Sequence, residues 1–108
     1  MRHVFQMFQG HRFLGGRALA NRVRNEACAL IAADPTAEVV LDFDRVEGVS
    51  HSFADELLAP LDELLHERVA EQVLLVNCAP DVLEQLEVVA LMHNMAMPGV
   101  AKSGAVAG

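Results

Sequence analysis

The side chains best suited to chemistry cluster in the stretch "VSHSFADE". Ser50 and Ser52 flank His51, and Asp55 and Glu56 follow within four positions. A hydroxyl beside an imidazole is the nucleophile and base of many covalent hydrolases. A serine with a carboxylate three residues later is a helix-capping box, and a serine at a helix start is also well placed to carry a phosphate. The stretch is therefore consistent with a catalytic site, a phosphorylation site or a helix cap.

The hydrolase interpretation requires a serine within hydrogen-bond reach of His51. Adjacent residues at a helix start rarely point at each other, and no glycine-rich nucleophile elbow accompanies them. We therefore expect no catalytic residue and keep a hydrolase-like site at His51 and Ser52 as an alternative. Ser52 and Asp55 have the capping-box spacing, for which a cap contributes ~1 kcal/mol. A cap at Ser52 leaves Ser50 and His51 unexplained.

The elements around this stretch place it at the end of a sheet. "EVVLDF" has the continuous apolar character of a strand buried on both faces. A helix is expected from Ser52, with a core stripe and a kink or break at Pro60. The stripe comprises Phe53, Leu57, Leu58, Leu61, Leu64 and Leu65. Binding sites of open α/β sheets form where strands end and loops lead into helices.

The remaining elements alternate strand and helix. Residues 3–8 favour a strand, which "QG" and "HRFL" extend into an opening hairpin. An amphipathic helix follows Gly16 and ends before Pro35. "QVLLVNC" predicts another buried strand, and a third helix begins at Pro80, with Val82, Leu86, Val89 and Ala90 as its core face. The fold class is α/β, with a small mixed, mainly parallel sheet and about three helices.

Length and charge restrict the function. The chain has 108 residues and a net charge of −7, which fits a single domain over residues 1–97 with a flexible, glycine-rich tail over 98–108. A negative surface disfavours nucleic acid, and we interpret Arg17, Arg22 and Arg24 as a solvated helix face. Because no apolar run approaches the ~18 residues of a membrane span and no secretion signal is evident, we expect a cytoplasmic protein.

Metal and redox chemistry find little support in the sequence. Cys28 and Cys78 form no CxxC pair, so we interpret both as small core residues with free thiols. The other histidines lack the spacing of metal ligands. They are His3, His11, His66 and His93. We expect neither a metal nor a cofactor.

Two motifs resemble the STAS domains, named for sulfate transporters and anti-sigma-factor antagonists, and within them the bacterial STAS-like domains of unknown function. The first is "FLGGRALANRVR", and the more specific second is "VVLDFDRVEGVSHSFADELL". The likeness covers roughly residues 3–94. The resemblance implies a sheet with helices packed against it, an opening hairpin and a role in protein interaction.

In the anti-sigma antagonists, a serine at the start of this helix is phosphorylated by a partner kinase of the histidine-kinase-like ATPase fold, and the phosphate blocks docking. Aligned without gaps from "LDF", the family's Asp-Ser-Ser/Thr-Gly falls on Ser50, His51, Ser52 and Phe53. His51 thus takes the usual phosphoacceptor place. Ser50 and Ser52 remain the candidate phosphorylation sites.

The resulting hypothesis is a non-catalytic regulatory module in signalling or transcription, whose protein partner is a histidine-kinase-like ATPase or an anti-sigma-type regulator. Its partner-binding residues are Val49, Ser50, His51, Ser52, Asp55 and Glu56. The alternative is a small enzyme or ligand-binding domain in which Asp42, His51 and Asp55 converge at the strand end. A homodimer formed through exposed sheet edges is a third hypothesis.

Overall fold

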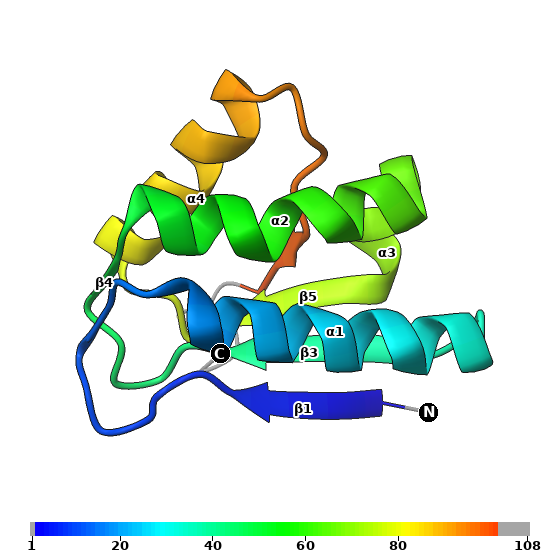
Figure 1. The fold of residues 1–108 in the computed structure, drawn as a ribbon, viewed down its shortest axis with the longest axis horizontal. Helices are drawn as coiled ribbons and strands as arrows, with labels where there is room; N and C mark the ends of the chain where they lie inside the picture. The colour runs from blue at the N-terminus through cyan, green and yellow to red at the C-terminus, as the bar shows by residue number, and fades with distance from the viewer. Residues whose placement is uncertain (1, 102–108) are drawn as a thin grey trace.

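The computed structural model describes residues 2–101, and its centre is a four-stranded sheet (Figure 1). The strands are β1 (Arg2–Gln6), β3 (Glu38–Asp42), β5 (Val73–Val76) and β6 (Gly99–Val100). They lie in the order β1-β3-β5-β6, and every neighbouring pair is parallel. Each strand is added on the same side of the one before it, so the strand order never reverses.

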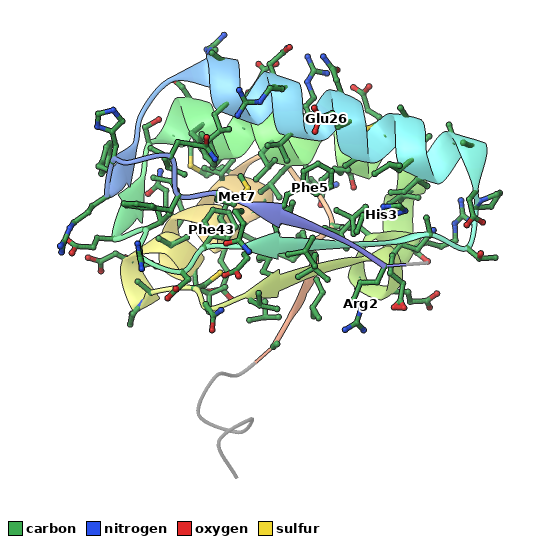
Figure 2. All side chains as sticks on the ribbon, turned by 90° about the horizontal axis from the view of Figure 1, so that it is seen from below. Arg2, His3, Phe5, Met7, Glu26 and Phe43 are labelled. Carbon is green, nitrogen blue, oxygen red and sulfur yellow. The ribbon has the colours of Figure 1, made fainter. Side chains whose placement is uncertain are left out.

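Three longer helices cover one face of this sheet: α1 (Arg17–Ala33), α2 (His51–Leu65) and α4 (Pro80–Met92). A short 3₁₀ turn, η1 (His66–Arg68), and α3 (Val69–Gln72) connect α2 to β5. Figure 2 shows the sheet nearly edge-on, with α1 and α2 above it and no helix below. Helices on one face are expected when successive parallel strands are joined by crossovers of one hand. The α/β class and the mainly parallel sheet are thus confirmed.

The prediction of an opening hairpin is wrong. The returning segment forms β2 (Phe13–Leu14), which pairs in parallel with β4 (Gly48–Val49) and makes a separate two-stranded sheet. Gly10 does turn the chain, with a φ of 97°. The turn leads away from β1, because pairing with β4 buries Leu14 and Val49 in the core, which a two-residue return strand beside β1 would not achieve.

The helix predictions hold, with two corrections in α2. α1 ends at Ala33, before Pro35, and α4 begins at Pro80 and buries the expected face. α2 continues through Pro60 without a break, because the leucines on both sides of the proline pack in the core and offset its ~3 kcal/mol cost. Leu64 is 39% exposed and does not belong to the core stripe, whereas Ala54, which was not part of the predicted stripe, is buried.

The tail prediction is wrong for residues 98–101. Pro98 is buried, Gly99–Val100 forms β6, and Ala101 N–H donates to Leu75 O over 2.9 Å. A two-residue strand has no readable alternation of its own, and it forms here because β5 offers an unpaired edge. Residues 102–108 of the expected tail lie outside the described residues.

Candidate functional site

The junction between β4 and α2 is fixed by Ser50. Its hydroxyl accepts a hydrogen bond from Phe53 N–H over 3.1 Å and donates one to Gly15 O over 3.0 Å. Ser50 is therefore the N-cap of α2 and also ties the start of this helix to the loop before α1. The predicted cap at Ser52 is wrong by two residues, since Ser52 already lies inside the helix. Val49, a predicted partner-binding residue, is only 5% exposed and packs in the core.

His51 is exposed at the first position of α2 and faces a histidine that sequence reasoning did not select. His51 Nε2 lies 3.5 Å from His93 Nε2, and the two rings meet edge to face with centroids 5.6 Å apart. His93 follows the last residue of α4. The two residues are separated by 42 positions, so only the packing of α2 against α4 brings them together.

Asp55 belongs to the same surface. Its Oδ1 atom lies 3.9 Å from His93 Nε2, and both side chains are about half exposed. At that distance and exposure, the attraction between the carboxylate and a protonated imidazole is weak. His51, His93 and Asp55 therefore form one polar surface across the start of α2 and the end of α4.

Glu56, in contrast, forms a mostly buried ion pair between two helices. Its Oε2 atom accepts from Arg24 Nη2 over 2.9 Å and from Asn21 Nδ2 over 3.1 Å. The Arg24 and Glu56 side chains are only 25% and 22% exposed. Glu56 therefore joins α1 to α2 and is not part of an open contact surface. The interpretation of Arg24 as a solvated residue is wrong as well, while Arg17 and Arg22 are exposed as expected.

Asp42 has a structural position at the end of β3. Its Oδ1 atom accepts from Asp44 N–H and from Asn77 Nδ2, both over 3.0 Å. The carboxylate thus ties together the loops that follow β3 and β5. Burial, and next to it the negative charge of Asp42, raises the pKa of the Cys78 thiol to about 11. Cys78 therefore stays a protonated thiol at neutral pH, as a residue packed against the core should.

A hollow of about 630 Å³ does exist at the carboxyl ends of the strands, in the range of small-ligand sites. Its lining includes Phe8, Arg12, Arg45 and Asn77, but none of Asp42, His51 and Asp55. The residues assigned to an enzyme by sequence are therefore not brought to this hollow. The strand order also lacks the reversal at which α/β enzymes usually open their ligand crevice.

Catalytic and metal chemistry gain no support from the side-chain arrangement. Among residues 2–101, neither Ser50 nor Ser52 forms a hydrogen bond with His51, so the nucleophile and base of a hydrolase are not assembled. Within the same part of the chain, no group of three or more histidine, cysteine or acidic side chains is arranged to hold a metal ion. Nor does the described chain contain a helix long and apolar enough to cross a membrane.

A parallel sheet with helices on one face, whose central strand leads through a short loop into a solvent-facing helix start, defines a STAS-like α/β domain. Comparison with protein families agrees: the model of the STAS-like domain of unknown function matches residues 20–83. The chain belongs to this family, and the match contains the whole of the more specific second motif, residues 39–58. No curated protein and no solved structure matches the chain significantly.

Proposed function

We propose that the domain is a regulatory module that docks a protein partner through the start of α2 and the end of α4. We define the docking surface as His51, Ser52, Asp55, Leu91, Met92 and His93. The family resemblance makes a kinase of the histidine-kinase-like ATPase fold the first partner to test, with an anti-sigma-type regulator second.

The exposure of the docking surface is the observation that carries the proposal. Leu91 and Met92 are 84% and 64% exposed, and they directly precede His93. Neighbouring apolar side chains that are exposed together mark interaction surfaces, and interfaces combine such anchors with a polar rim. Here His51, Asp55 and His93 would supply the rim, since they lie close together and His93 directly follows the two apolar residues in the chain.

The same geometry makes Ser52 the better of the two candidate phosphorylation sites. Phosphorylation of Ser50 would remove the hydroxyl that caps α2 and holds Gly15. Ser52 takes part in neither contact and lies in the first turn of α2, where the helix dipole favours a phosphate. Because Arg24 already neutralises Glu56, Asp55 is the acidic neighbour that would repel the phosphate.

The enzyme alternative keeps one supporting feature, the hollow at the strand ends. That hollow is separate from the residues proposed to act in it, so docking accounts better for the exposed residues of α2 and α4. A ligand that binds the hollow would leave the chemical shifts of His51 and His93 unchanged, whereas a docked partner would shift them.

Capture of purified candidate kinases tests the proposal. His51→Ala and Met92→Ser should each reduce capture at least tenfold, with the melting temperature within a few degrees of wild type, because neither residue is buried. His11→Ala, which removes an exposed histidine outside the docking surface, is the matched control and should leave capture intact. Equal effects of His51→Ala and His11→Ala would contradict the proposed surface.

A further inference from the structure

β1 is the longer of the two edges of the sheet, and half of its backbone groups face outward. Met7 N–H donates to Asp42 O, so the odd-numbered residues of this segment direct their backbone groups toward β3. Since these groups alternate along a strand, those of Arg2, Val4 and Gln6 point away from the sheet. At the opposite edge β6 has only two residues, which is one of the ways in which proteins blunt an edge.

The helix above β1 presents small apolar residues beside this edge. A hollow of about 400 Å³ lies between β1 and α1, lined by Phe5, Glu26, Ala29, Leu30 and Ala33. Figure 2 looks onto this edge, with His3 and Phe5 directed toward α1 and Glu26 above them. A free strand edge and an apolar helix flank therefore face the same direction.

We propose that this edge is the interface of a homodimer, in which β1 pairs antiparallel with β1 of a second copy about a two-fold axis at Val4. In that register Val4 lies opposite Val4, and Arg2 lies opposite Gln6 of the second copy. All three are residues whose backbone groups face outward, so they form the hydrogen-bonded pairs of an antiparallel ladder. The two sheets become one continuous sheet of eight strands, counted from the four in each copy.

The rows of side chains on the helix-free face fit this register. Val4, Val40 and Leu74 form one row across β1, β3 and β5. Val4 at the end of this row is 54% exposed, whereas Val40 beside it is 6% exposed. In the dimer the rows of the two copies join end to end through Val4, which buries the exposed valines against each other.

The charged rows on either side are complementary in the same register. Arg2 lies beside Glu38 of its own chain, with Arg2 Nη2 and Glu38 Oε2 3.7 Å apart. In the second copy, Gln6 is paired with Asp42. Each Arg2 would therefore lie between Glu38 of its own chain and Gln6 of the second copy, with Asp42 one strand beyond Gln6, and no like charges would lie directly opposite each other.

The helix side of the interface has a hollow that offers space for side chains of the second copy. His3 of each copy would lie opposite Phe5 of the other, and these rings would extend into the hollow beside Ala29 and Ala33. Gln6 O already accepts from Gln9 Nε2 over 3.0 Å. A carbonyl oxygen has two lone pairs, so it can accept the second copy's Arg2 N–H as well. α2 and α4 contribute no residue to this interface, so a dimer would display two docking surfaces.

Sedimentation equilibrium of the full chain between about 1 and 100 μM tests the dimer, because interfaces of the smaller size class dissociate in this range. Val4→Lys should raise the dissociation constant on the order of 100-fold, since it places two lysines directly opposite each other. Val4 is exposed in one copy, so the variant should fold, and its circular dichroism melt verifies that. Arg2→Glu should also weaken the dimer, because it places a third acid in a row with Glu38 and Asp42.

Val100→Lys is the matched control, since Val100 is a 39%-exposed valine on the opposite edge strand. It should leave the dissociation constant unchanged. A wild-type chain that is monomeric throughout this range overturns the proposal, as does a dimer that Val100→Lys dissociates while Val4→Lys does not. Neither result bears on the docking surface, whose capture experiment can succeed with a monomer.

Discussion

Arg24 on α1 and Glu56 on α2 form a half-buried ion pair, with Nη2 and Oε2 2.9 Å apart. Asn21 donates a second hydrogen bond to the same carboxylate oxygen. Among the described residues, Arg24 Nε is a buried donor without a partner. The ion pair and the Asn21 hydrogen bond together fix how α1 and α2 pack against each other. They thereby also fix the position of the first turn of α2.

Loss of this pair should cost measurable stability. Because both side chains retain some contact with water, we expect Glu56→Ala to lower the free energy of unfolding by about 1 to 2 kcal/mol, less than the 3 to 5 kcal/mol of a fully buried pair. Urea unfolding measures the difference. Arg12 and Glu47 form the matched control, because their contact of 2.7 Å is far more exposed, at 75% and 64%.

Glu47→Ala should change the free energy of unfolding by less than about 0.5 kcal/mol. Similar losses in Glu56→Ala and Glu47→Ala would show that burial of the Arg24 pair does not matter. A double-mutant cycle with Arg24→Met then separates the pair from the other contacts of each residue.

The two serines at the start of α2 should respond differently to alanine. Ser50→Ala removes both the cap and the bond to Gly15 O, so we expect a loss of about 1 to 2 kcal/mol. Ser52→Ala should stay within about 0.5 kcal/mol of wild type. Thermal melts monitored by circular dichroism give the comparison. A larger loss for Ser52→Ala would restore the capping box expected from the spacing of Ser52 and Asp55.

The elements that sequence predicted well are those whose signal is local. The helix face from Val23 through Ile31 and the continuous apolar character of "VVLDF" report burial directly. The choice of a partner strand leaves no local signal, because the sequence at Phe13 and Leu14 is the same whether the segment pairs with β1 or with β4. The hairpin prediction is wrong because the segment pairs with β4, and this pairing buries Leu14 in the core.

The site was predicted in part for the same reason. His51 and Asp55 are recognisable because a polar cluster interrupts apolar elements. His93 lies 42 positions away from His51 and had no spacing to mark it. Glu56 was misassigned because its partner Arg24 lies on a different helix. Only the packing of α1, α2 and α4 separates the residues that remain exposed from those that become paired.

Cys78 should make stability decrease in alkaline solution. The pKa of its thiol is raised from 9.0 to about 11, chiefly by burial. Between these values the folded state keeps a proton that the unfolded state loses, so stability is complete below pH 9 and falls as the pH rises toward 11. Because the thiol is partly exposed, we expect a loss on the order of 1 kcal/mol.

Urea unfolding at pH 8, 9 and 10.5 measures this loss, and Cys78→Ala should flatten the curve over that interval. Cys28→Ala serves as the comparison: burial also raises the pKa of Cys28, but without the large shift seen at Cys78. An unchanged alkaline slope in Cys78→Ala would assign the loss to other groups.

Gly99 tests whether the segment after α4 is part of the folded domain. A Cβ atom at this position would lie 2.7 Å from Ala70 O, a backbone atom of α3 that cannot rotate away. Gly99→Ala should therefore push β6 off β5 and lower the free energy of unfolding by roughly 1 to 3 kcal/mol.

Gly16→Ala is the matched control, because Gly16 has a φ of −94° and a Cβ atom there meets nothing within 4 Å. It should change stability by less than about 1 kcal/mol. Hydrogen exchange at Ala101, whose N–H donates to Leu75 O, should accelerate in Gly99→Ala alone, because only that variant releases the strand from the sheet. Slow exchange at Ala101 together with unchanged stability in Gly99→Ala would show that α3 moves to accept the methyl group and that the close approach of β6 does not limit this position.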